Sequence, residues 1–196
     1  QLVIHGGGNT SVKTIVDDFI GDSTEVLCVK GSGWDLDTIE PAGLPAVRLK
    51  PLLRMREREY LSDEEMVSFQ RQNLLDPTSP NPSVETLLHA YLPHKFVDHT
   101  HACAVLSLTN QANGIAYCED LYGDDVSVAP FVMPGFELSK VVADIWDATG
   151  RATLIFIDQE GGRVARLKAP EWPLFPRGED YALVYQSDRE RGLEAA

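Results

Sequence analysis

Two histidines, His99 and His101, stand two residues apart in a segment, 96–106, whose apolar composition predicts a β-strand. Alternate side chains of a strand point to the same face, so both imidazoles are expected on one face. Two imidazoles at this spacing can bind one metal ion, and a catalytic zinc site commonly has three protein ligands and an open position. The alternative is a pair of polar side chains on a half-buried strand. The pattern therefore raises the question of a third ligand.

A carboxylate that could serve this pair stands shortly before it in the chain. Asn81 and Pro82 predict the start of a helix, with Asn81 as N-cap and Pro82 at the first helical position, running to about Leu92. Ser83 would then lie in the first turn, where free N–H groups favour anions. Glu85 is either a favourable charge at a helix start or a proton-transferring group near a metal.

Small residues follow two predicted strands and could form an anion cradle. The first segment is 6–11, in which Gly8 and Asn9 combine backbone freedom with a side-chain donor. The second is 30–35, with Ser32 and Gly33 after the strand 25–30. Either segment could equally be an ordinary turn.

The remaining pattern alternates strands with helices and predicts an α/β or α+β class. Ser62 and Glu65 form a capping box at the start of a helix that is expected to end near Leu75. Further predictions are a strand over 124–132, a helix over 138–147 and a strand over 151–158.

Composition narrows the function classes for these 196 residues. The net charge of −13 argues against a general nucleic-acid or anionic-membrane surface. The three cysteines form no C-x-x-C pair and suggest a reducing compartment. No apolar run is long enough for a transmembrane helix, and no signal peptide is evident, so we expect a cytoplasmic location. The first residues look like the inside of an element, so an earlier start is expected.

Together these segments resemble the class II aldolase/adducin family, and most closely the aldolase domain of bifunctional rhamnulose-1-phosphate aldolase/alcohol dehydrogenases. The matching stretches are HGGGNTSVK (5–13), VKGSGWDLDTIEPAGLPAVRL (29–49), NPSVETLLHAYLPHKFVDHTHACAVLSLTNQ (81–111) and PFVMPGFELSK (130–140). The resemblance implies an α/β fold, a three-layer α-β-α sandwich around a central, mainly antiparallel sheet. It covers residues 1 to about 148.

The resemblance also implies roles for particular residues. Catalytic Glu85 and the zinc ligands His99 and His101 match the family's motifs. The phosphate-binding positions match too, with one departure, because Val84 replaces the second serine of the family's Ser-Ser-Glu motif. The implied phosphate-binding residues are Gly8, Asn9, Ser32, Gly33 and Ser83.

The family's third zinc ligand has no counterpart here. It is a His in a later His-Gly motif, but this chain has no His after His101. Glu160 precedes Gly161 in that register and is a possible substitute, since carboxylates also ligate zinc. From about residue 152 the chain instead resembles the start of family 3 β-N-acetylhexosaminidases, in which Asp158 and Arg166 match sugar-binding residues.

The sequence thus predicts a truncated aldolase-like domain over 1–150 and a strand-loop-helix tail over 151–196 that resembles a hydrolase fragment. The expected reaction is zinc-dependent cleavage of a ketose 1-phosphate such as rhamnulose 1-phosphate, impaired by loss of the third His. Alternatives are a glycoside hydrolase fragment and a non-catalytic adducin-like module. The expected partners are a phosphorylated sugar and, by resemblance, further copies in a tetramer, with no nucleic acid or membrane.

Overall fold

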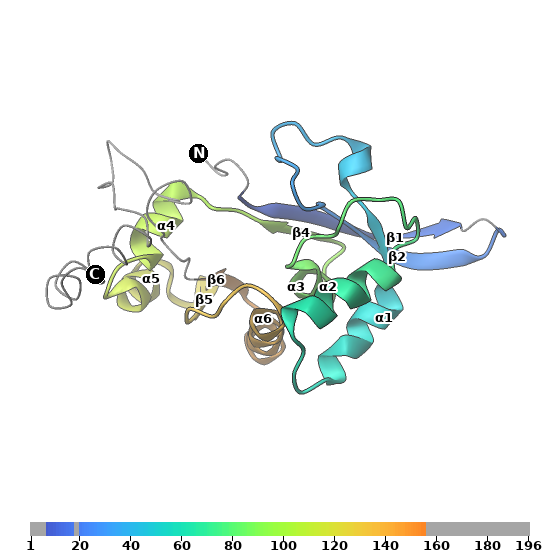
Figure 1. Ribbon diagram of the computed structural model, residues 1–196. Coiled ribbons are helices and arrows are strands. Elements are labelled where there is room, and N and C mark those ends of the chain that lie inside the picture. Colours follow the sequence, from blue (N-terminus) through green and yellow to red (C-terminus); the bar gives the residue numbers. More distant parts are fainter. Residues whose placement is uncertain (1–6, 18–19, 156–196) are drawn as a thin grey trace, which may run out of the picture.

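A four-stranded antiparallel sheet forms the centre of the protein in a computed structural model that describes residues 7–17 and 20–155 (Figure 1). The sheet comprises β1 (Asn9–Asp17), β2 (Ser23–Val29), β3 (Ala46–Arg48) and β4 (Phe96–His99) in the order β3-β2-β1-β4. The expected α/β fold with a mainly antiparallel sheet is confirmed.

Helices cover one face of this sheet, and the core lies between them and the strands. They are α1 (Leu49–Arg54), α2 (Asp63–Gln72) and α3 (Thr86–Tyr91), and α6 (Phe136–Thr149) packs against α3. Leu27 and Val29 alternate along β2, are fully buried and pack with Leu52 and Met66. All six residues of α3 are buried, which makes this short helix the central one. Short 3-10 turns occur at Pro41–Gly43, Met55–Glu57 and Gly123–Asp125.

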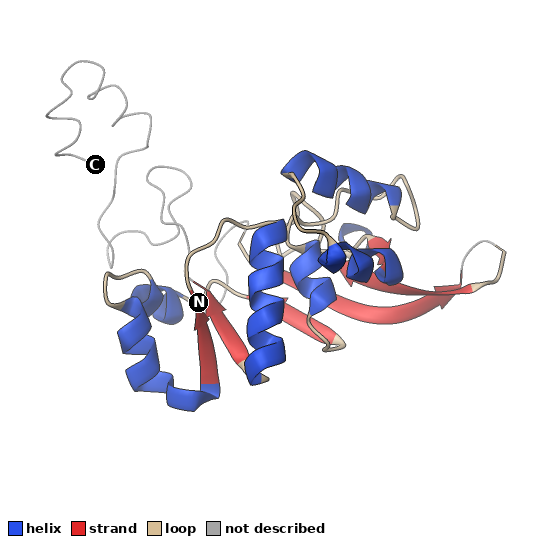
Figure 2. Cartoon of the chain, turned by 90° about the horizontal axis from the view of Figure 1, so that it is seen from below, coloured by secondary structure: helices blue, strands red, loops and turns tan. Residues whose placement is uncertain are grey.

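A second, two-stranded sheet lies beside the first (Figure 2). Here β5 (Val126–Ala129) and β6 (Ala152–Ile155) are parallel, and α6 crosses over between them. Helices α4 (Cys103–Thr109) and α5 (Gly114–Tyr122) lie at this end of the molecule. No helix among the described residues is long and apolar enough to cross a membrane.

The predicted strand over 96–106 is wrong beyond His99. β4 pairs with β1, and the last pair of their register joins His99 to Asn9. Gly8, the residue before Asn9, has a φ of 77°, and among the described residues β1 offers no further position for the residues after His99 to pair with. The chain continues into α4 instead.

The predicted helix start at Asn81 is also wrong, because α3 begins at Thr86 with Glu85 as N-cap. Residues 81–83 pair with the segment after β2 instead. Ser32 N donates to Asn81 O at 2.8 Å, and Ser83 N donates to Lys30 O at 3.1 Å. Backbone groups used in this way are not available for a helical turn.

The capping box is confirmed. Ser62 Oγ accepts from Glu65 N at 3.2 Å, and the Glu65 carboxylate accepts from Ser62 N at 3.1 Å. The helix ends at Gln72, earlier than expected, since Leu74 forms an isolated bridge with Val47 of β3.

Candidate functional site

Four predicted site residues from three elements meet at one end of the central sheet. Asn9 is at the start of β1, His99 at the end of β4, His101 just beyond it, and Glu85 at the cap of α3. Glu85 Oε2 accepts from Asn9 Nδ2 and lies 2.9 Å from His99 Nδ1. His99 Nε2 in turn lies 2.9 Å from His101 Nε2. The structure thus connects residues that are up to 92 positions apart in the sequence into one chain of polar contacts.

The site is partly buried. The side chain of Glu85 is 12% exposed and that of His99 is 26% exposed. Burial on its own raises the pKa of Glu85, but the hydrogen bond with His99 and the electrostatic interaction with that ring outweigh it, so the pKa is lowered. Glu85 is therefore ionised at neutral pH and accepts a hydrogen bond from His99 Nδ1–H.

This bond leaves the other ring nitrogen of His99 to face His101. When a carboxylate holds one N–H of a histidine, the second nitrogen presents its lone pair to a metal, as second-shell carboxylates do in zinc sites. A tetrahedral zinc with Zn–N bonds of about 2.0–2.1 Å places two nitrogens roughly 3.3 Å apart. The observed 2.9 Å between the two Nε2 atoms is a hydrogen-bond distance, somewhat shorter than that spacing, so the rings would separate slightly to hold zinc. The two imidazoles therefore fit zinc as two of its ligands.

A third ligand is not found among the described residues, where no group of three or more His, Cys, Asp or Glu side chains is arranged to hold a metal ion. Glu160, the possible substitute, lies outside the described residues, as do Asp158 and Arg166 of the hydrolase-like tail.

The predicted phosphate-binding residues surround the same end of the sheet. Gly8 and Gly33 both have left-handed backbone, with φ of 77° and 87°. Ser83 is buried, and its Oγ accepts from Glu85 N at 3.2 Å. Ser32 is exposed and donates to Pro82 O at 3.3 Å. Backbone bonds between 30–32 and 81–83 join the second and third predicted segments.

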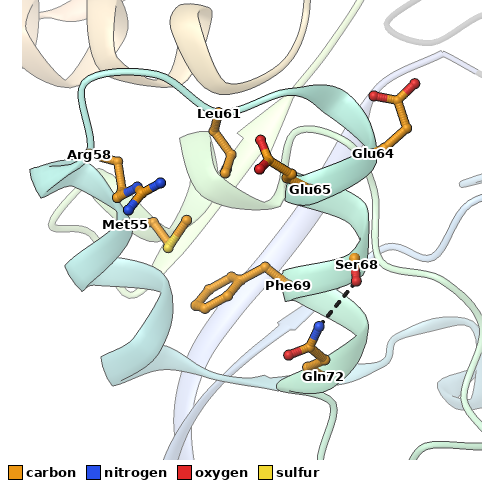
Figure 3. Close-up of a pocket in the computed structure, with 8 residues that line it drawn as sticks. All are labelled: Met55, Arg58, Leu61, Glu64, Glu65, Ser68, Phe69 and Gln72. Atoms are coloured by element: carbon orange, nitrogen blue, oxygen red, sulfur yellow. Dashed lines mark hydrogen bonds between the residues drawn. The ribbon is translucent and has the colours of Figure 1, made fainter.

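A separate groove of about 500 Å³ opens between the end of α1 and α2 (Figure 3). Its apolar lining comes from Met55, Leu61 and Phe69. The charged lining residues are Arg58, Glu64 and Glu65. None of its lining residues belongs to the predicted site.

Comparison with known proteins settles the family. The family model described as Class II Aldolase and Adducin N-terminal domain matches residues 1–161. The chain belongs to the class II aldolase/adducin family.

Two relatives are similar to this chain in sequence. A solved structure, the N-terminal class II aldolase domain of a conserved protein from Thermoplasma acidophilum, is 42% identical, with a TM-score of 0.69. That match covers 73% of this chain and 67% of the other. The uncharacterized oxidoreductase YuxG of Bacillus subtilis is 42% identical over 156 residues, which are 80% of this chain. The chain spans 23% of the length of YuxG.

Two residues beside the candidate site were not predicted as members of it. His89 is fully buried on α3, and its Nδ1 lies 2.8 Å from Ser11 Oγ of β1. Burial lowers the pKa of His89 to about 4, which keeps the ring neutral. Lys30, at the end of β2, is only 5% exposed. The only sequence signal for His89 was its spacing of four from Glu85, and for Lys30 its position directly after a buried strand.

Proposed function

We propose that this class II aldolase domain cleaves a ketose 1-phosphate, such as rhamnulose 1-phosphate, to dihydroxyacetone phosphate and lactaldehyde. The observation that carries the proposal is the contact of Glu85 with His99, whose second nitrogen faces His101. A proton-transferring carboxylate beside two metal-binding imidazoles is the donor set that a zinc-dependent retro-aldol reaction needs. Family membership supports this choice over other metal chemistry.

The proposed cofactor is zinc, held by His99 Nε2 and His101 Nε2. When bound, zinc supplies Lewis-acid stabilisation of the negative charge that develops on the substrate oxygens. Glu85 moves a proton at Oε2. In the condensation direction the ionised carboxylate takes the proton from the carbon beside the carbonyl of dihydroxyacetone phosphate, and in the cleavage direction it returns that proton. Asn9 Nδ2 orients the carboxylate by donating to the same oxygen.

Phosphate binding is proposed for the small-residue segments around the site. Gly8 and Gly33 turn the chain so that backbone N–H groups can converge on an anion, and Ser32 and Ser83 add hydroxyl groups. Val84, exposed on the same segment as Ser83, offers no hydroxyl where the family has a second serine.

Impaired turnover is expected from the incomplete ligand set. Two imidazoles hold zinc more weakly than three ligands do. The direct test is an enzyme-coupled assay for dihydroxyacetone phosphate with rhamnulose 1-phosphate and added zinc. Slow, chelator-sensitive release that is lost in His99→Ala supports the proposal. His94→Ala, which changes an exposed histidine, is the matched control. Fast, chelator-sensitive release would contradict the impairment, and no release at any zinc concentration would contradict the aldolase activity.

A non-catalytic adducin-like module is the second candidate. It is favoured by the absence of a complete three-ligand group among the described residues. The retained Glu85–His99 contact argues against it, because a module without chemistry has no need of a carboxylate held against an imidazole. Zinc stoichiometry separates the two candidates.

We further propose that residues 151–196 have the origin of a family 3 glycoside hydrolase and are joined to an aldolase-like unit over 1–150, with the first strand of the tail, β6, pairing with β5 of that unit. Limited proteolysis with mass spectrometry tests this division. Cleavage after β6 that leaves a stable core supports it, and uniform resistance of the chain after residue 155 contradicts it. By family resemblance we also propose that the protein forms a tetramer. We propose a cytoplasmic location as well. Light scattering coupled to size exclusion tests the oligomeric state.

A further inference from the structure

Two neighbouring side-chain contacts join β1 to α3. Asn9 and Ser11 are two residues apart on β1 and share the strand face toward the helix. Glu85 and His89 are four residues apart and lie on one side of α3. Asn9 Nδ2 donates to Glu85 Oε2, and one helical turn further on Ser11 Oγ lies 2.8 Å from His89 Nδ1. The contact of His89 is therefore the neighbour of the contact that holds the proposed proton-transferring carboxylate.

His89 is also bonded to Glu85 through the backbone. The carbonyl of an N-cap residue accepts the first hydrogen bond of its helix. In α3 the donor of this bond is the N–H of His89, which lies 3.2 Å from Glu85 O. The ring and the backbone of His89 together connect the backbone of Glu85 to β1.

The contact between His89 and Ser11 lies inside the fold. His89 is fully buried, and Ser11 is 4% exposed. Ser11 is also fixed within the sheet, because it pairs with Val29 of β2 on one side and with Val97 of β4 on the other. A buried polar group that loses its partner has no water to replace it, so the ring of His89 is held at one place on a central strand.

The start of α3 depends on tertiary contacts for its position. The helix has six residues, and an isolated helix shorter than about 12–15 residues is marginal in water. Glu85, its N-cap, makes no capping hydrogen bond within the described helix and directs its carboxylate to Asn9 and His99 instead. The backbone from which this carboxylate extends is thus placed by contacts with the sheet, and His89 makes one of them a single turn away.

We propose that His89 is a positioning residue for Glu85, and that its bond to Ser11 sets the place of the Glu85 carboxylate against His99. The inference rests on the proposed aldolase function, in which Glu85 remains the group that moves the proton. A misplacement of about 1 Å at a reacting group can cost roughly 10²-fold in rate. Loss of the contact between His89 and Ser11 should therefore reduce turnover more than substrate binding.

Two amide replacements of His89 differ in where they offer a hydrogen bond. The amide of asparagine lies at the place of Nδ1 of an imidazole, whereas the amide of glutamine lies near the place of Nε2. His89→Asn should keep the contact with Ser11, and His89→Gln should lose it. Ser11→Ala removes the same contact from the side of the strand. Ser62→Ala, which removes the capping box of α2, controls for a general loss of stability.

The tautomer of His99 reports the position of Glu85 without any catalysis. The wild-type carboxylate accepts from His99 Nδ1–H, so ¹⁵N NMR without added zinc should show the Nδ1–H form. His99→Ala assigns the signals by their absence. The share of the Nε2–H form should rise several-fold in Ser11→Ala and in His89→Gln, and it should stay at the wild-type level in His89→Asn and Ser62→Ala.

The NMR outcomes decide the inference even if one variant does not fold. A wild-type tautomer of His99 in Ser11→Ala overturns the inference, and this variant alone decides if His89→Gln is unfolded. A folded His89→Asn that behaves like His89→Gln also overturns it, because the proposed role depends on Nδ1.

Steady-state kinetics with rhamnulose 1-phosphate are the second measurement. In Ser11→Ala and His89→Gln, kcat should fall roughly tenfold or more while KM changes by less than about twofold. His89→Asn should recover most of kcat, and Ser62→Ala should keep it. A rise in KM at constant kcat overturns the inference.

The aldolase proposal fails by a different result. If the wild type releases no dihydroxyacetone phosphate but the His99 tautomer changes in Ser11→Ala and His89→Gln, His89 positions Glu85 in a protein that is not this aldolase. If the wild type cleaves the substrate and both variants keep the wild-type kcat and tautomer, the role of His89 alone is overturned.

Discussion

Nδ1 of His99 and Oε2 of Glu85 are 2.9 Å apart, and this contact joins the end of β4 to the cap of α3. It fixes which ring nitrogen of His99 is free, because the carboxylate accepts from Nδ1–H. The other nitrogen, Nε2, lies 2.9 Å from Nε2 of His101. A single hydrogen bond thus orients the carboxylate of Glu85 and the ring of His99 relative to each other.

Glu85→Gln should separate these two functions. The amide oxygen can still accept from His99 Nδ1–H, so zinc content should stay close to that of the wild type. The amide cannot exchange a proton, so the rate of dihydroxyacetone phosphate release should fall roughly 10²–10⁴-fold. Coupled kinetics and elemental analysis of the same preparation measure both. Glu64→Gln, an exposed change of the same kind on α2, is the control. Full activity in Glu85→Gln would falsify the catalytic role.

His89 should make the stability of the fold sensitive to mild acid. Burial lowers its pKa to about 4, against 6.5 in the unfolded chain. Between pH 6.5 and 4 the unfolded chain takes up a proton that the folded chain does not, so the free energy of unfolding decreases as the pH falls. The decrease due to this group is on the order of 3 kcal/mol.

Urea unfolding at several pH values measures this effect in wild type, His89→Gln and His94→Gln. His89→Gln should be less stable at pH 7 by about 1 kcal/mol, because the contact with Ser11 is lost, and less sensitive to acid. His94→Gln, at an exposed position, should keep the acid sensitivity of the wild type. If the free energy of unfolding changes with pH to the same extent in all three proteins, His89 is not the source of the acid sensitivity.

Local signals in the sequence identified elements that depend on neighbours in the chain. The capping box of Ser62 and Glu65 was predicted because both partners lie within four residues. The strand β2 was predicted within two residues of its ends because its apolar residues are continuous. The capping box depends only on contacts within its own segment. The strand requires only an apolar core against which its side chains can pack.

Ser62→Ala tests how much the capping box contributes to the stability of the fold. The change leaves Glu65 N without its side-chain acceptor and should lower the free energy of unfolding by about 1 kcal/mol. Ser68→Ala, within the same helix, should change it by less than half of that amount. Urea denaturation of both variants is the measurement, and equal effects would argue against a specific cap.

The errors arose where a distant segment decides the local structure. The helix was expected from Asn81, but residues 30–32 bind the backbone of 81–83 and delay α3 to Thr86. The strand was expected to continue past His99, but its partner β1 starts at Asn9. The predicted site residues nevertheless meet, because His99 is still on β4 and Glu85, although not inside the helix, caps α3 beside it. The burial of Lys30 and His89 could not be predicted, since it depends on how these segments pack.

Lys13 should hold α3 and β4 in their relative positions. Its Nζ donates to three carbonyls where α3 leads into β4, at 2.8 Å to His89 O, 2.7 Å to Leu92 O and 2.8 Å to His94 O. Lys13→Met leaves these carbonyls without this donor and should destabilise the fold by about 2 kcal/mol. Lys50→Met is the exposed control. Thermal and urea unfolding measure the difference, and equal stability of the two variants contradicts a bridging role.

Zinc content should report whether the two histidines form a metal site. After equilibration with zinc and removal of unbound metal, we expect at most one zinc per chain, released readily by a chelator because two imidazoles bind zinc weakly. His99→Ala and His101→Ala should each abolish binding, since one remaining imidazole is too few. His94→Ala should bind as the wild type does. Elemental analysis measures the stoichiometry, and competition with a chromophoric chelator measures the affinity. If zinc persists equally in His99→Ala and His101→Ala, the metal lies elsewhere, and the contact of Glu85 with His99 has no part in holding it.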